Sequence, residues 1–135
     1  MKKLLTLAAA TVASLGLAVN AQAEYPTGPV QFIVPWPPGD FEDILTRMIA
    51  ANMQEATGIP ASVVNRPGGG DGPFPGALEV LEAPADGSVV GSFVLGVPIV
   101  GPRIGIGIEE DSFVPVGIFL TYPFVLASAG DSGYS

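Results

Sequence analysis

Two loops rich in glycine and proline hold the residues of this sequence that are best suited to binding a ligand. The first, residues 36–40, precedes a predicted helix whose first amides have no partner within the helix. The second, residues 65–70, contains three successive glycines, which let the backbone approach a ligand closely. Such amides could hold a carboxylate, with water. Alternatively, proline and glycine form only tight turns here, and Asp40 is only a helix cap.

The residue types needed for catalysis are scarce. The chain has no histidine and no cysteine, which removes the commonest general base and the soft metal ligands. Ser92 has no evident base to activate it. The glycines at 68–72 match neither common nucleotide-binding spacing. The acidic residues at 109–111 lack the alternating spacing of a calcium loop and indicate a solvated turn. We therefore predict a protein that is not an enzyme, without a cofactor or metal site.

A strand followed by a helix would position the first loop. Residues 30–34 form an apolar run typical of a strand that is covered on both faces. Residues 41–57 repeat apolar side chains at helical spacing, and Asp40 can cap the first amides. The apolar face expected for this helix comprises Ile44, Leu45, Met48, Ile49 and Met53.

The same alternation continues beyond the first helix. Residues 61–64 predict a second strand, 77–81 a short helix and 89–95 a third strand. This order predicts a parallel α/β sheet with right-handed crossovers. In such a sheet the two loops follow the carboxyl ends of the first two strands, where open α/β sheets bind ligands.

The pattern is weaker toward the carboxyl terminus. Residues 96–107 alternate glycine, proline and aliphatic side chains, which suits a loop or an irregular connection. Residues 113–120 and 124–127 indicate two more strands, separated by a turn at 121–123.

The amino terminus has the features of an export signal. Lys2 and Lys3 precede an uncharged apolar stretch, residues 4–19, which is shorter than a membrane span. Ala21 and Ala23 then form a small-x-small cleavage site, so we predict a signal peptide over residues 1–23, cleavage after Ala23 and a periplasmic location. The formal net charge of −8 makes nucleic acid an improbable partner.

Five short segments occur in an order that resembles a known family. They are VPWPPG at 34–39, the acidic residue Asp43, VVNRPGGG at 63–70, APADG at 83–87 and DSFVPV at 111–116. This pattern is similar to the start of the extracytoplasmic solute receptors of the tripartite tricarboxylate transporter family, also called Bug proteins. The resemblance covers essentially all of residues 24–135.

The resemblance implies a type II periplasmic-binding fold, in which two α/β lobes close on a small carboxylate that is then delivered to membrane permease subunits. It implies one wall of the site at Pro38, Gly39 and Asp40. Trp36 would lie either beside an apolar part of the ligand or in the core on the hinge side. The opposite wall would comprise Asn65, Pro67, Gly68, Gly69 and Gly70. Gly96 and Pro98 would form a further wall after the third strand. Asp40 departs from the family, which usually has glycine there, so the site could favour a ligand with a cationic or hydroxylic group.

Family members are more than twice as long as this chain. The resemblance therefore implies that residues 24–135 are the amino-terminal part of the solute-binding domain, a truncated first lobe reaching the crossover toward the second. On this interpretation the sequence is a fragment of a longer protein. The alternatives are a small secreted acidic protein that acts through protein–protein contacts without a small ligand, and a fragment of an exported hydrolase.

Overall fold

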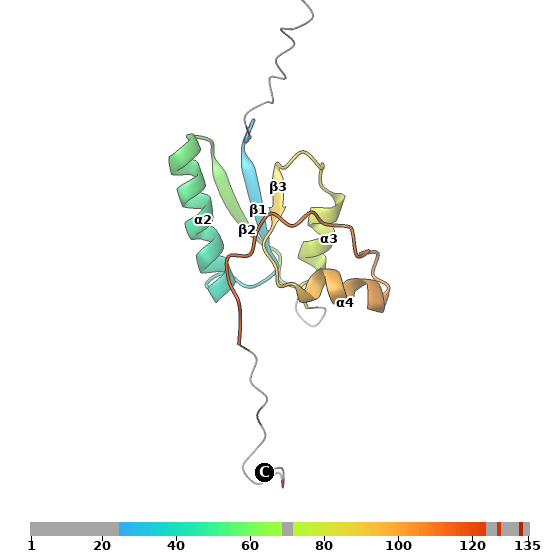
Figure 1. Cartoon of the computed structure of the whole chain (residues 1–135). Coiled ribbons are helices and arrows are strands. Elements are labelled where there is room, and N and C mark those ends of the chain that lie inside the picture. The colour runs from blue at the N-terminus through green and yellow to red at the C-terminus, as the bar shows by residue number, and fades with distance from the viewer. Residues whose placement is uncertain (1–24, 69–71, 124–126, 128–132, 134–135) are drawn as a thin grey trace, which may run out of the picture.

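The computed structural model describes residues 25–68, 72–123, 127 and 133 (Figure 1). In this part of the chain, strands and helices alternate along the sequence. The elements are β1 (Val30–Val34), α2 (Phe41–Thr57), β2 (Ala61–Asn65), α3 (Phe74–Glu82), β3 (Val89–Gly91) and α4 (Gly96–Ile104). The predicted signal peptide, residues 1–23, lies outside the described residues.

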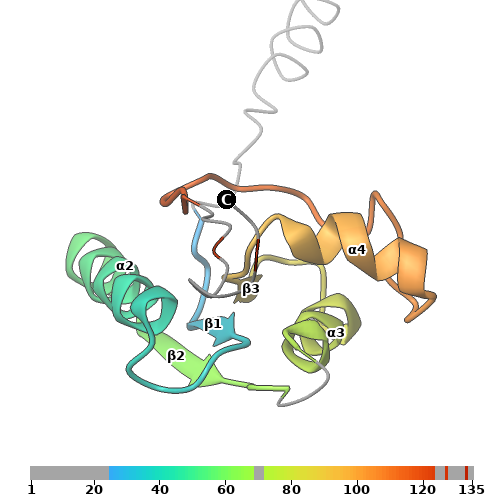
Figure 2. The ribbon, with the colours of Figure 1, turned by 90° about the horizontal axis from the view of Figure 1, so that it is seen from below.

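The three strands form one parallel sheet in the order β2-β1-β3. Val30 pairs with Ala61 on one side of β1, and Gln31 pairs with Val89 on the other. Helix α2 covers one face of the sheet and α3 covers the opposite face (Figure 2). The central strand is therefore enclosed on both faces, which explains its apolar sequence. The predicted parallel α/β sheet is confirmed.

Helix α2 begins and ends where the sequence predicts. The Asp40 carboxylate accepts a hydrogen bond of 2.6 Å from the Phe41 amide at the amino terminus. Gly58 ends the helix in the left-handed region at φ 71°, and its amide donates to the Gln54 carbonyl.

The buried face of α2 differs from the predicted apolar face. Ile49 and Met53 do pack against the core residues Val30, Phe32 and Ala50. Ile44 and Met48, in contrast, are exposed. Polar residues take their place next to the sheet, and the buried residues of α2 are Glu42, Asp43, Thr46 and Ala50. The prediction for Ile44 and Met48 was wrong because hydrogen-bonding partners make polar burial possible on the adjacent face.

The third strand and the helix before it have different lengths from those predicted. Helix α3 extends the expected segment 77–81 in both directions, and Pro75 lies in its first turn, a position that proline favours. Strand β3 ends at Gly91, whereas the prediction extended to residue 95. Phe93 and Val94 leave the sheet and pack instead around Val97 and Ala77.

The prediction of a loop or irregular connection at 96–107 was wrong, because residues 96–104 form α4. Val97 of this helix packs with Ala77 of α3 and with Ile108. Gly101 allows close packing, since a Cβ atom there would lie 2.9 Å from Ile108 Cβ. Tertiary packing thus overrides the weak helix propensity of glycine and proline in this segment.

The predicted strand at 113–120 was also wrong. This segment has no strand conformation, and Val114, Val116 and Ile118 are almost fully exposed. It leaves the α4 side of the sheet and runs back toward the start of α2 (Figure 1). There Tyr122 packs edge-on against Phe41, with ring centroids 6.4 Å apart. The predicted strand at 124–127 falls mostly outside the described residues.

Candidate ligand-binding site

A small depression lies between the loops that follow β1 and β2. Its volume is about 150 Å³, and its lining residues are Pro35, Trp36, Pro37, Pro67, Gly68 and Gly72. Because β1 and β2 are parallel neighbours, their carboxyl ends bring the two loops to the same edge of the sheet. Three residues predicted to bind ligand, Trp36, Pro67 and Gly68, therefore line one concave surface.

A hydrogen-bond network holds these two loops together. The Asn65 side-chain nitrogen donates to the Trp36 carbonyl at 3.0 Å and to Asp43 Oδ1 at 2.8 Å. Arg47 Nη2 donates to Asn65 Oδ1 at 2.8 Å and forms an ion pair with Asp43. Both amide hydrogens of Asn65 are thus engaged within the protein. The Asn65 side chain positions the loops and has no spare donor for a carboxylate.

Asp43 is the centre of this network. Burial alone would raise the pKa of its carboxyl group. Hydrogen bonds from Arg47, the Gly39 amide and Asn65, together with the charge of Arg47, outweigh burial and hold the pKa below its ordinary value. The Asp43 carboxylate is therefore ionised at neutral pH and fixes the loop before α2.

Pro38, Gly39 and Asp40 are exposed and are not among the residues lining the depression. Gly39 has φ 88°, which favours glycine, and its amide donates to Asp43 Oδ2 at 2.8 Å. The Asp40 carboxylate caps α2 through the Phe41 amide. The structure thus gives Gly39 and Asp40 roles in forming the turn, and their contact with a ligand stays a prediction.

The remaining predicted site residues lie elsewhere. Gly96 and Pro98 are in the first turn of α4, and neither lines the depression. Gly69 and Gly70 lie outside the described residues.

Glu42 is a candidate functional residue that the sequence did not single out. It is only 4 % exposed, and burial raises the pKa of its carboxyl group to about 7. The negative charge of Asp40 acts in the same direction, whereas hydrogen bonding by Trp36 and Ser92 opposes it. The available signal was its helical spacing from Thr46 and Ala50, which share the buried face.

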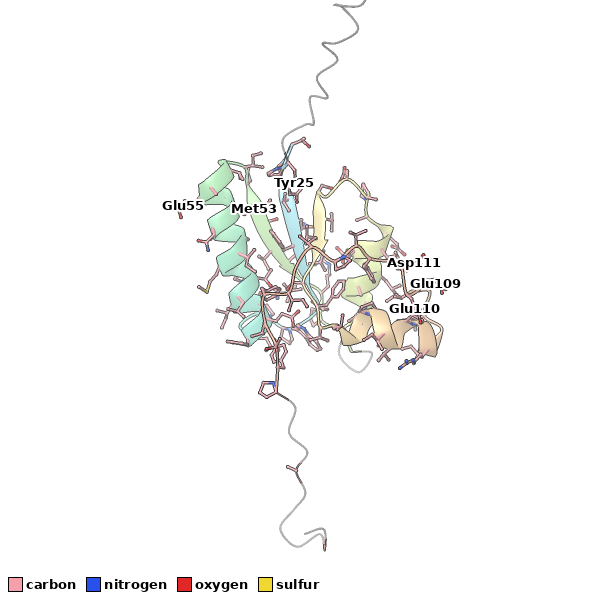
Figure 3. All side chains as sticks on the ribbon, viewed as in Figure 1. Tyr25, Met53, Glu55, Glu109, Glu110 and Asp111 are labelled. Carbon is pink, nitrogen blue, oxygen red and sulfur yellow. The ribbon has the colours of Figure 1, made fainter. Side chains whose placement is uncertain are left out.

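The acidic residues after α4 do not form a metal site in the structure. Glu109, Glu110 and Asp111 lie together on the outer side of the loop that follows α4 (Figure 3). Across the described ranges, no group of three residues suited to holding a metal ion is present. No helix in the same ranges is both long and apolar enough to cross a membrane.

The chain is related to several curated proteins. It is 33 % identical over 135 residues to protein BugT of Bordetella pertussis, a match that covers 95 % of this chain and 40 % of BugT. It is 34 % identical over 113 residues to the UPF0065 protein in the tcbD-tcbE intergenic region of Pseudomonas sp., covering 82 % and 33 % of the two chains. The chain thus spans 40 % or less of the length of these relatives. No protein-family model matches it.

The structure is similar to a crystal structure of a TctC solute binding protein from Polaromonas. The TM-score is 0.58 at 28 % sequence identity, and the match covers 68 % of this chain and 31 % of that one. The parallel sheet with helices on both faces therefore matches part of the fold of that solute-binding protein. Over these residues the chain belongs to the Bug family, the TctC-like solute receptors.

Proposed function

We propose that the chain is part of a periplasmic receptor that captures a small organic carboxylate and delivers it to the permease subunits of a tripartite tricarboxylate transporter. The observation that carries this proposal is the depression between the loops after β1 and β2, which Trp36, Pro67 and Gly68 line. It lies at the sheet edge where α/β proteins bind ligands, in a chain related to solute-binding proteins.

Backbone groups and one aromatic ring are the features available for recognition in this depression. The lining residues are prolines, glycines and Trp36, so no lining side chain carries a charge. Arg47 and Arg66, the nearest cations in sequence, form ion pairs with Asp43 and Glu79. A carboxylate would then be held by loop amides and the positive end of α2, with its apolar part against Trp36.

We propose that the receptor performs no chemistry on its ligand. Ser92 is buried, and its hydroxyl lies 2.7 Å from the hydroxyl of Thr46. A nucleophile needs a base to activate it and access to the substrate. The position of Ser92 offers neither a histidine nor an open surface.

Ligand binding can be tested with Trp36, which is the only tryptophan of the chain. Succinate, citrate, L-glutamate and benzoate would be titrated while its fluorescence is recorded, with thermal unfolding as a second measurement. We expect one of these acids to change the fluorescence saturably and to raise the unfolding temperature. If all four leave both signals unchanged, carboxylate capture by this chain is contradicted.

A substitution at Gly68 tests the place of binding. A Cβ atom there would collide with the Gly72 carbonyl and lie 2.8 Å from Pro75 Cδ, so Gly68→Ala must move the loop. We expect this variant to lose at least tenfold in affinity. Gly28→Ala is the matched control, since nothing lies within 4 Å of a Cβ atom at Gly28. Equal loss in both variants would argue against a site between the two loops.

Export is tested separately. A periplasmic receptor with a signal peptide at 1–23 should appear in the periplasmic fraction and begin at Glu24 after cleavage at Ala23. Mass spectrometry of the purified chain determines its first residue. A chain that retains Met1 in the cytoplasm would contradict this part of the proposal.

A second candidate function is contact with another protein, without a small ligand. The exposure of Val114, Val116 and Ile118 on one extended segment favours it, because adjacent exposed apolar side chains mark interaction surfaces. Replacing all three by serine would abolish such an association in analytical ultracentrifugation and leave carboxylate binding unchanged.

A further inference from the structure

The depression between the loops after β1 and β2 has the size and the lining of a site for one apolar ring. Its lining consists of three prolines, two glycines and Trp36, so rings and backbone form its surface. Its volume of about 150 Å³ is comparable to that of an apolar protein cavity that binds one benzene molecule. The depression can therefore accept a six-membered ring without a charged side chain beside it.

Trp36 is fixed in place before any ligand binds. Its carbonyl accepts a hydrogen bond of 3.0 Å from the Asn65 side chain, which also donates to the buried Asp43 carboxylate. A residue that is already anchored loses little conformational freedom when a ligand packs against it. An aromatic ligand ring also gains a stacked or edge-on interaction with the indole that an aliphatic chain does not gain.

The arginines in the two loops and helices around the depression are already neutralised. After residue 3, the basic side chains of the sequence are Arg47, Arg66 and Arg103. Arg47 forms an ion pair of 2.9 Å with Asp43, and Arg66 forms one of 2.6 Å with Glu79. A second ligand carboxylate would have to displace one of these protein carboxylates. Each ion pair gained by the ligand would then be an ion pair lost by the protein.

Arg103 lies in the last turn of α4 and does not line the depression. Asp40, in contrast, is one turn of chain from the lining residue Pro37, and its amide donates to the Pro37 carbonyl at 3.2 Å. The negative charge of Asp40 repels every further carboxylate that a ligand brings. The positive end of α2 is equivalent to only about half an elementary charge, so it can offset one ligand carboxylate but not two or three.

We propose that the ligand of this site is a monocarboxylate that carries a single aromatic ring. This inference rests on the proposed function and narrows its ligand class. The ring packs against Trp36 and the prolines, and the carboxylate binds loop amides toward the start of α2. Di- and tricarboxylates bind more weakly, because their additional charges lose water without gaining a cation.

The ligand class is tested by calorimetric titration of the purified chain with benzoate, acetate, succinate, citrate and L-glutamate. Benzoate and acetate each have one carboxylate, but only benzoate has a ring. Succinate and citrate add carboxylates without a ring. We expect benzoate to bind at least about tenfold more tightly than each of the other four acids, since only its ring buries apolar surface in the depression.

The place of the ring is tested with Trp36→Leu, which keeps an apolar side chain but removes the aromatic rings. We expect its preference for benzoate over succinate to fall about tenfold. Tyr25→Leu is the matched control, because Tyr25 precedes β1 at the opposite end of the strand (Figure 3). Urea unfolding shows whether each variant is folded. Pro67→Ala, which removes a lining ring at an exposed position, provides the same test if Trp36→Leu does not fold.

Tighter binding of succinate, citrate or L-glutamate than of benzoate would overturn this inference and leave the proposed function intact. Equal affinities for benzoate and acetate would do the same, because the ring would then contribute nothing. An unchanged preference for benzoate in the folded Trp36→Leu and Pro67→Ala variants would place the ring outside the depression and also overturn the inference. Absence of binding of all five acids to the wild-type chain would reject the proposed function and this ligand class together.

Discussion

The Asn65 side chain donates a hydrogen bond of 2.8 Å to Asp43 Oδ1 and thereby joins the end of β2 to the first turn of α2. The same nitrogen donates to the Trp36 carbonyl after β1. One amide group thus fixes the relative position of the two loops that line the depression. The shape of the depression therefore depends on Asn65, whose side chain bonds to other residues of the protein and not to a ligand.

Replacing Asn65 by alanine should destabilise the fold by about 1–3 kcal/mol, because the buried Asp43 carboxylate loses a donor. The free energy of urea unfolding measures this change. Asn52→Ala on the exposed side of α2 is the control, with an expected effect within about 0.5 kcal/mol. Similar unfolding energies for both variants would show that the network contributes little.

The buried Glu42 should make the protein less stable as pH rises from about 4.5 to about 7. Over this interval the unfolded chain releases the Glu42 proton while the folded chain retains it, so unfolding becomes more favourable. Below pH 4.5 both states are protonated, and above pH 7 both are ionised, so this contribution is constant outside the interval. We expect a loss of about 1–3 kcal/mol.

The unfolding free energy of Glu42→Gln should lack this pH-dependent loss, because an amide does not titrate. Glu55→Gln controls for the removal of one negative charge from α2. An identical pH dependence in wild type and Glu42→Gln would show that folding does not raise the pKa of Glu42.

Removing the side chain of Ile108 should cost about 2–5 kcal/mol in Ile108→Ala, because this residue is buried against Ala77 and Val97. Ile118→Ala provides a matched control, since the same side chain is almost fully exposed at position 118. Thermal and urea unfolding measure the change in stability of each variant. Equal effects would contradict the packing of α4 on α3.

The ion pair between Arg66 and Glu79 should contribute less than about 1 kcal/mol, although its atoms are only 2.6 Å apart. Its side chains are 47 % and 39 % exposed, so water and salt screen the attraction. We expect Glu79→Gln to unfold near the wild-type urea concentration, with a smaller difference at high salt. A loss of unfolding free energy as large as that of Asn65→Ala would contradict the small contribution expected for this ion pair.

The first half of the described fold follows from local sequence patterns. The apolar run of β1, the Asp40 cap and the Gly58 end of α2 are each specified by nearby residues, and their predicted bounds were confirmed. Helix α4 could not be predicted in this way. Gly96, Pro98 and Gly101 disfavour helix locally, and only packing against α3 stabilises this conformation.

Residues 113–120 show the converse case, in which the local pattern predicts a strand that the structure does not form. Their alternating valine and isoleucine side chains are typical of a strand, but strand formation also requires a neighbouring strand to accept and donate hydrogen bonds. Sequence predicted that Trp36, Pro67 and Gly68 would meet, because parallel strands end at one edge. It did not predict the burial of Glu42, which depends on the distant residue Ser92 and on the rotation of α2 about its axis.

The central position of β1 also has a consequence for the order in which the protein folds. Its pairing with residues 61–65 closes a much shorter stretch of chain than its pairing with residues 89–91. Since the entropy lost on loop closure grows with the length of the loop, β1, α2 and β2 can assemble first and form a template for β3. We therefore expect the amides that pair β1 with β2 to gain protection from hydrogen exchange earlier during refolding than the amides of β3.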